Sequence, residues 1–223
     1  MFLVGRRENL VKEKIKNKKF LITFFVILLI SIFIIFFIKN NYKNFKTGNN
    51  MSNKSIEEIE EYILNISSYE ATVQVTIESN RNTNKYVISQ QYISPNKSKQ
   101  IVLEPSNIEG LEIEYDGQKL SINNTRFNLS KIYDNYKYVV ENFLNLESFI
   151  EDYKSCKEQG KTKLYEEDDE FVLEVEQNSN KYVFNKKLYI SKATGKPTKL
   201  LINDINEKTV VYILYNEISI NDL

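Results

Sequence analysis

The sequence predicts an α+β protein, mainly β, in which an N-terminal transmembrane helix precedes a curved antiparallel sheet packed around two helical segments. Three observations support this fold class. One long run near the N-terminus is almost entirely apolar, much of the chain after residue 68 alternates apolar and polar residues, and two shorter stretches carry apolar residues at helical spacing. Helices that lie far apart in the sequence cannot bury their apolar stripes against each other alone, so we expect a sheet to wrap around them.

The apolar run Phe20–Ile38 covers nineteen positions without a charge, and Thr23 and Ser31 are its only polar residues. As a helix it is about 28 Å long, which matches a bilayer core of about 30 Å. A helix satisfies its own backbone hydrogen bonds, so such a segment spans lipid without partners. The sequence therefore predicts a single membrane span at these residues.

The flanking charges predict the orientation of this span. Seven Lys or Arg residues precede it, whereas Lys39, Lys43 and Lys46 follow it. By the positive-inside rule the N-terminus lies in the cytoplasm of a single-pass protein of the cell membrane. We therefore expect four parts, which are a basic cytoplasmic tail (1–19), the span (20–38), a polar linker (39–54) and an extracytoplasmic domain (55–223).

A cleaved signal peptide is the alternative, because it also places a basic stretch before an apolar run. Here the apolar run is longer than the usual stretch of about 7 to 15 residues, and the following KNNYKNFKTG offers no small-x-small cleavage site. A lipoprotein signal needs a cysteine just after the run, but the single cysteine of the chain is Cys156. These features favour an uncleaved anchor.

The formal net charge is zero but unevenly distributed. Residues 1–46 hold ten Lys or Arg and two Asp or Glu, whereas the remaining residues hold twenty and twenty-eight. The basic end suits an anionic cytoplasmic leaflet. The acidic remainder argues against a nucleic-acid partner, since neutralising phosphates requires a basic surface.

The extracytoplasmic part begins with a predicted short helix. Ser55 and Glu58 have the spacing of a capping box, and isoleucines then recur at helical intervals through SIEEIEEYILNI. From Tyr69 the period changes to two, which predicts a strand with one buried face. Further strands are predicted at 84–94 and 99–104.

The strongest turn signal is Asp116-Gly117 within LEIEYDGQKLSI. A two-residue type I′ turn there pairs Ile113 with Leu120 and Leu111 with Ile122, so that apolar residues meet on one face. The candidate residues for this face, either as core or as an apolar groove, are Val73, Val75, Ile77, Leu111, Ile113, Leu120 and Ile122.

The rest of the chain predicts a second helix and a meander. Residues 130–153 lose the alternation and fit a helix, interrupted near Asn145. Strands are then predicted at 171–176, 181–191, 197–205 and 209–220, which gives about eight to ten strands in all.

Residues suited to catalysis are scarce. The chain has no histidine, which excludes histidine-based triads and imidazole metal sites, and a lone cysteine cannot form a thiolate cluster. The acidic run Glu166–Glu170 lacks the alternating spacing of a calcium loop, so we interpret it as a solvated loop. Cys156 has nearby lysines able to lower a thiol pKa, but a stray thiol is the simpler interpretation. We therefore expect no catalytic residues, no metal, no cofactor and no enzyme.

The order of these segments resembles a known family. A helix runs into SSYEATVQVTI, followed by QQYISPNKSKQIVLEP, by YDGQKLSI and by LYISKATGKPTKLLINDINEKTVVYILYNEISIN. This order resembles the LolA-like lipoprotein-carrier superfamily over residues 55–221, most specifically at Tyr115-Asp116-Gly117 and Gly195-Lys196-Pro197. The resemblance implies an incomplete antiparallel barrel closed by helices.

Within that superfamily the chain is similar to the germination lipoproteins of spore-forming Gram-positive bacteria (the GerS type). The resemblance implies a place on a forespore membrane and support of a cortex amidase, one of the cell-wall-modifying enzymes. This chain departs from the type because a transmembrane helix replaces the lipobox cysteine.

Two functions follow as hypotheses. The first is a tethered binding or regulatory module that docks an envelope protein such as a cell-wall amidase. The second is a carrier or sensor of a lipid or acyl chain; self-association into a homodimer also stays open. A carrier needs an unfilled apolar cavity, whereas a docking module needs an exposed apolar patch or sheet edge.

Overall fold

The computed structural model describes residues 54–79, 81–135, 144–180 and 182–221, all within the compact unit formed by residues 50–223. Among these residues, no helix has the length and apolar character needed to cross a membrane. The predicted span Phe20–Ile38 lies outside the described residues, as do the basic tail and almost all of the linker.

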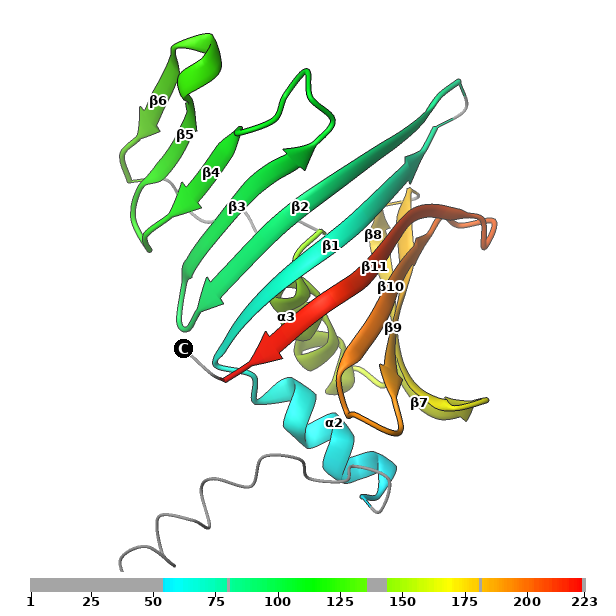
Figure 1. Ribbon diagram of the computed structural model, residues 1–223. Coiled ribbons are helices and arrows are strands. Elements are labelled where there is room, and N and C mark those ends of the chain that lie inside the picture. Colours follow the sequence, from blue (N-terminus) through cyan, green and yellow to red (C-terminus); the bar gives the residue numbers. More distant parts are fainter. Residues whose placement is uncertain (1–53, 80, 136–143, 181, 222–223) are drawn as a thin grey trace, which may run out of the picture. The chain divides into compact units, whose positions relative to one another are not determined.

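The described residues form one antiparallel sheet of eleven strands (Figure 1). Its order is β6-β5-β4-β3-β2-β1-β11-β10-β9-β8-β7, so two meanders join where the first strand pairs with the last. This arrangement confirms the predicted mainly β fold built on one open antiparallel sheet. The strands are β1 (Ser68–Glu78), β2 (Thr83–Ile93), β3 (Lys97–Glu104), β4 (Glu112–Tyr115), β5 (Leu120–Asn124), β6 (Leu129–Tyr133), β7 (Thr162–Glu167), β8 (Glu170–Asn180), β9 (Val183–Ser191), β10 (Pro197–Asn203) and β11 (Thr209–Ile220).

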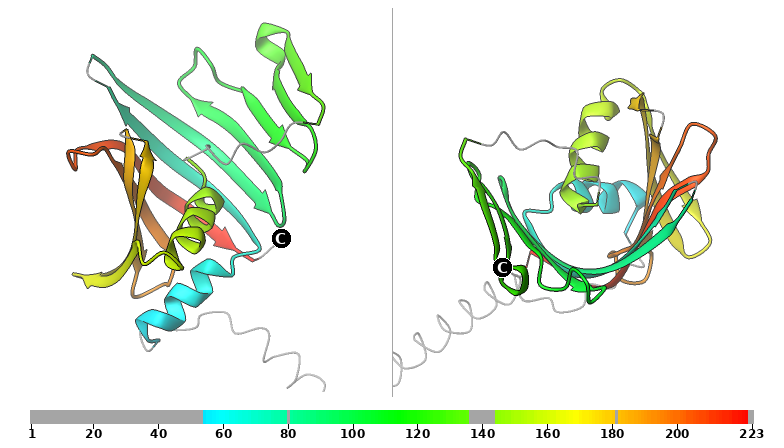
Figure 2. Two further views of the ribbon diagram at one scale, coloured as in Figure 1. Left: turned by 180° about the vertical axis from the view of Figure 1, so that it is seen from behind. Right: turned by 90° about the horizontal axis from the view of Figure 1, so that it is seen from above.

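Two helices, α2 (Ile56–Leu64) and α3 (Leu146–Lys157), lie inside the curve of this sheet, on the side of strands β7–β11 (Figure 2). The predicted capping box starts α2, because Ser55 and Glu58 exchange side-chain and backbone hydrogen bonds. Ile59 and Ile63 of this helix are fully buried. The isoleucine spacing therefore puts the apolar stripe of α2 into the core.

Polar contacts, in addition to apolar packing, hold the helices in place. Glu60 of α2 accepts a hydrogen bond from the Tyr153 hydroxyl of α3 at 2.8 Å and from Lys157 Nζ at 2.7 Å. Asp152 of α3 forms an ion pair with Lys186 of β9, whose side chain is only 4% exposed. The two helices and the sheet are thus cross-linked by charged groups as well as by the core.

The hairpin between β4 and β5 differs in register from the prediction. Ile113 pairs with Ile122 and Tyr115 with Leu120, so the turn spans four residues rather than two. The Asp116 carboxylate explains this, since its Oδ1 accepts the backbone N–H groups of Gln118 at 2.9 Å and Lys119 at 2.8 Å. Because the slip is by two residues, the apolar side chains stay on the predicted face.

Two further strands replace predicted helix or loop. Residues 130–133, predicted as the start of a helix, instead belong to β6 and pair with β5, after Asn128 adopts φ +50° at the turn. The helix itself begins at Leu146, and residues 136–143 lie outside the described residues. Strand β7 was missed because TKLYEE has only a weak alternation, yet it pairs with β8 along its whole length.

Candidate functional site

The concave face of the sheet, which we call the inner face, is filled by side chains where the helices lie. Val73 and Val75 of β1 are 0% and 1% exposed and belong to the main core cluster. Ile77 is half-buried and packs against the same cluster. Cys156 is buried in that core as well, which does not fit a reactive surface thiol. The structure thus makes this part of the predicted face a core.

The inner face differs over strands β4–β6, which we call the open wing. Ile113, Leu120 and Ile122 point to the inner side there but are only half-buried, as is Leu111 just before β4. Leu129 and Tyr133, on the same side of β6, are 40% and 41% exposed. Figure 2 shows both described α-helices on the opposite arm of the curve, so neither of them covers this wing.

The convex face of the sheet, which we call the outer face, carries a larger and a smaller hollow lined by described residues. The larger, about 370 Å³, crosses β11, β1, β2 and β3, and the smaller, about 190 Å³, lies beside it towards β4. The lining of the larger hollow combines short and charged side chains. Its outward residues include Glu70, Thr72, Ser89, Gln91, Lys99 and Glu217. The larger hollow is mainly polar, whereas the smaller one includes Ile93 and Tyr115 beside charged residues.

A buried polar cluster marks the border between the filled part and the open wing. The Tyr69 hydroxyl donates to Glu147 Oε2 at 2.5 Å and accepts from the Leu146 N–H at 3.3 Å. Asn145 Nδ2 donates to Glu147 Oε1 at 2.8 Å. Burial and the Glu147 carboxylate raise the pKa of Tyr69 well above its ordinary value. This cluster fastens the start of α3 to β1.

Two glutamines extend the cluster to β2 and β3. Gln90 donates to the Leu144 carbonyl at 3.0 Å, and Gln100 donates to Asn145 Oδ1. Both glutamines are buried on the inner face and are direct partners across the two strands. The sequence indicates that Gln90 is buried, because it lies between Ile88 and Tyr92 on the apolar side of its strand.

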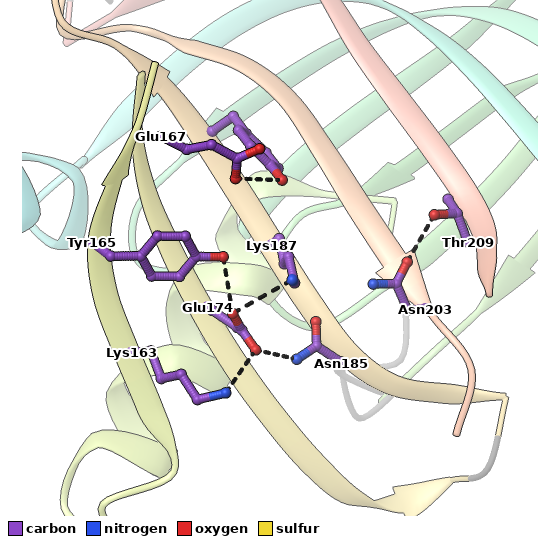
Figure 3. A network of polar contacts seen from close by, with 9 residues as sticks. Lys163, Tyr165, Glu167, Glu174, Asn185, Lys187, Asn203 and Thr209 are labelled. Carbon is purple, nitrogen blue, oxygen red and sulfur yellow. Dashed lines mark hydrogen bonds and ion pairs between the residues drawn. The ribbon is translucent and has the colours of Figure 1, made fainter. Parts of the chain in front are cut away.

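A second polar network covers the outer face of β7–β11 (Figure 3). Glu174 of β8 accepts from Asn185 Nδ2 at 2.7 Å, from the Tyr165 hydroxyl at 3.0 Å and from Lys163 Nζ at 3.2 Å. Burial acts to raise the pKa of Glu174, but these donors outweigh it and hold the pKa below its ordinary value. Lys187 Nζ lies 3.6 Å from the same carboxylate. Two ammonium groups therefore lie against the one Glu174 carboxylate.

The phenols of this network are weaker acids than free tyrosine. Burial and the Glu174 carboxylate raise the pKa of Tyr165, and burial with the charge of Glu167 raises the pKa of Tyr189 to about 12. Each phenol therefore keeps its proton at neutral pH and donates it to a carboxylate. This geometry stabilises the outer face and does not create a general base or a nucleophile.

The acidic run predicted as a loop is distributed over two strands. Glu166 and Glu167 end β7, Asp168 adopts φ +51° in the turn, and Glu170 begins β8. Their partners differ, since Glu166 pairs with Lys192 at 3.0 Å and Glu170 with Lys199 at 2.7 Å. Across the described ranges, no three His, Cys, Asp or Glu side chains converge on a position for a metal ion.

Comparisons with known proteins place the chain among sporulation proteins. A family model described as "Sporulation protein YdcC-like" matches residues 17–222. A search of curated proteins finds no match. The link to sporulation expected from the sequence agrees with the description of this family.

Three similar solved structures share low sequence identity with the chain. One belongs to the CwlD amidase from Clostridioides difficile in complex with the GerS lipoprotein, with 23% identity, 72% of this chain and 91% of that chain covered, and a TM-score of 0.47. An uncharacterised conserved protein from Thermus thermophilus has 14% identity, coverages of 76% and 90%, and a TM-score of 0.48. A LolA superfamily protein from Nitrosomonas europaea has 14% identity, coverages of 76% and 95%, and a TM-score of 0.40.

Proposed function

The chain belongs to the YdcC-like family of sporulation proteins, and from this premise we propose that it is a tethered binding module of the sporulating cell's envelope. Its extracytoplasmic domain docks a cell-wall-modifying enzyme, such as an amidase, through the inner face of the open wing. The class of enzyme follows the resemblance to the germination lipoproteins. The docking surface follows the geometry of this chain.

The single observation that carries the proposal is the difference in exposure along one face of one sheet. Val73 and Val75 are sealed by the helices, whereas Ile113 and Ile122 on the same face are only half-buried. Contiguous apolar surface on a folded domain is typical of a site that another molecule covers. An enzyme-binding role needs no catalytic group in the module itself.

A membrane tether is the second part of the proposal. The apolar run Phe20–Ile38 has the length of a bilayer core, and the family model, which starts at residue 17, includes it. Lysines and arginines before the run favour a cytoplasmic N-terminus, with the domain outside, on the cell membrane or the forespore membrane. A tether of this kind limits docking to one membrane surface.

A lipid- or acyl-binding role is the second candidate function. The same half-buried residues, Ile113, Leu120 and Ile122, are the ones that an acyl chain would contact. A carrier needs an enclosed apolar volume, whereas docking needs only an exposed apolar surface. We rank docking of a protein first because the half-buried residues of the open wing form such a surface.

Site-specific photocrosslinking in sporulating cells tests the proposal. The crosslinking residue replaces Ile113 in the full-length chain, and the matched control replaces Glu114, which follows it on the outer face of β4. We expect a cell-wall-modifying enzyme to be crosslinked from position 113 and not from position 114. Recovery of lipid alone from position 113 would support the carrier function instead, and equal recovery from both positions would contradict docking through the inner face.

A further inference from the structure

Among the described residues, β6 and β7 are the two edge strands of the sheet, and their chemistry differs. At one end β7 carries Lys163, Glu166 and Glu167, of which the first two form ion pairs with Glu174 and Lys192. Charges on an edge strand discourage another strand from pairing with it. Strand β7 also contacts α3. This end of the sheet is therefore protected in the way that natural edge strands usually are.

At the other end, β6 lacks most of that protection. All five of its residues are exposed, including Leu129 at 40%, Ile132 at 61% and Tyr133 at 41%. Its pairing with β5 runs without a bulge, and Lys131 is the one charge within the strand. An apolar, regular edge strand presents a row of backbone N–H and C=O groups as a template for pairing.

The register of β6 defines what an added strand would meet. In an antiparallel pair, every second residue turns its backbone groups away from its neighbour, so β6 offers donors and acceptors on the side opposite β5. Leu129, Lys131 and Tyr133 lie on the inner face, continuous with the open wing, and Ile132 lies on the outer face. A strand that complements β6 is therefore an extended segment with apolar residues at alternate positions and an acidic residue opposite Lys131.

We propose that β6 receives an extended strand of the partner protein, which lengthens the eleven-stranded sheet by one. This inference rests on the proposed docking function and specifies its chemistry. Main-chain hydrogen bonds supply the affinity, and the apolar residues with the Lys131 ammonium supply the selectivity. The incoming strand also places its inner side chains beside Leu129, Lys131 and Tyr133, which continue the inner face of the open wing.

A second copy of this chain is a poorer occupant of the same edge. Two β6 strands paired about their centres would place Lys131 directly opposite Lys131. Like charges at directly opposed positions destabilise a strand pair. Charge complementarity therefore favours a different chain with an acid at that position.

A designed peptide probes the edge directly. The probe is an acetylated peptide in which valine alternates with threonine around a central glutamate, and its control carries proline in place of one threonine. Both are titrated against the full-length chain in lipid nanodiscs, and the binding site is located by hydrogen–deuterium exchange. We expect protection at β6 and a loss of affinity of about tenfold for the proline control, as one or two missing backbone hydrogen bonds predict.

A charge swap tests the role of Lys131. The variant Lys131→Glu is expected to bind the glutamate probe about fivefold more weakly and a lysine-centred probe more tightly, whereas Lys85→Glu, exposed on β2, leaves both unchanged. Protection outside β6, or insensitivity to proline, would overturn the inference. So would a β6-paired dimer seen in sedimentation. If the peptide behaves as expected but position 113 crosslinks no enzyme, the pairing edge stands and the proposed enzyme docking fails.

Discussion

The filled part of the inner face and the open wing share a sequence pattern but differ in burial. Strand β1 alternates Val73 and Val75 with polar residues, and the β4–β5 hairpin alternates Ile113 and Ile122 in the same manner. The first pair is at most 1% exposed, whereas the second is half-buried. The difference follows from the position of α2 and α3, which cover one arm of the curve and not the other. On the inner face the helices thus make Val73 and Val75 part of the core, although Tyr115 of β4 is buried too, at 5% exposure.

This comparison also separates two kinds of interaction. The helices are attached to the filled part by apolar packing, by the Lys186–Asp152 ion pair and by the Tyr69–Glu147 cluster. The β4–β5 hairpin of the open wing is held in place by the turn at Asp116 and by its ladder to β3. We therefore expect substitutions in the filled part to change stability and substitutions in the wing to change docking.

The largest expected effect comes from placing the same charged residue, an aspartate, in each of the two regions. Val75→Asp buries an unpaired carboxylate among core residues and should reduce the free energy of unfolding by about 4 kcal/mol. Ile113→Asp, on the half-buried face, should reduce it by about 1 kcal/mol or less. Denaturant unfolding of the full-length chain in detergent measures both. Equal losses would show that the wing is as closely packed as the core.

The next effect concerns the ion pair beneath α3. Asp152→Ala leaves the Lys186 ammonium buried without its partner, and we expect a loss of about 3 kcal/mol. The double variant Asp152→Leu with Lys186→Met should recover most of this loss, because replacing both charges by apolar groups removes the desolvation penalty. The same unfolding measurement applies. A double variant as unstable as Asp152→Ala would indicate that packing, rather than charge burial, limits this site.

These differences explain which parts of the fold could be predicted from the sequence alone. Alternation identified most strands and the buried phase of β1, since period two depends only on local pattern. It could not separate Val75 from Ile113, because the covering helix comes from a remote part of the chain. It failed at β6, whose Leu129 and Ile132 also fit a helical spacing, and at the hairpin register, which depends on the hydrogen bonds of the Asp116 side chain.

A smaller effect is expected from the buried polar cluster at the border between the two regions. Tyr69→Phe removes the hydroxyl that donates to Glu147 and accepts from the Leu146 N–H, and should cost about 2 kcal/mol because a buried carboxylate loses a donor. Hydrogen exchange in the first turn of α3 should accelerate. The matched control is Tyr212→Phe, whose residue is 36% exposed on β11, and which should change neither quantity. Unchanged exchange in Tyr69→Phe would mean that the Tyr69 hydroxyl does not hold the first turn of α3 in place.

The smallest effect tests the outer face through its pH dependence. The folded pKa of Glu174 lies below its ordinary value of 4.5, so this carboxylate stabilises the fold above that pH, and the contribution is lost as the pH falls through the folded pKa. Glu174→Gln should be less stable than the parent by about 1 kcal/mol or less at neutral pH, and the two should converge below pH 4.5. Unfolding free energies measured from neutral to acidic pH give this difference directly.

The control for this titration is Glu114→Gln, on the outer face of the open wing. Glu114 is exposed and lies across from Lys99, whose ammonium pairs with Glu112 instead. We expect its difference from the parent to stay near zero over the whole pH range, since exposed charges contribute little. If Glu114→Gln converged with the parent as Glu174→Gln does, the acid sensitivity would belong to the whole acidic domain. Convergence in Glu174→Gln alone would assign it to the network that ties β7, β8 and β9 together.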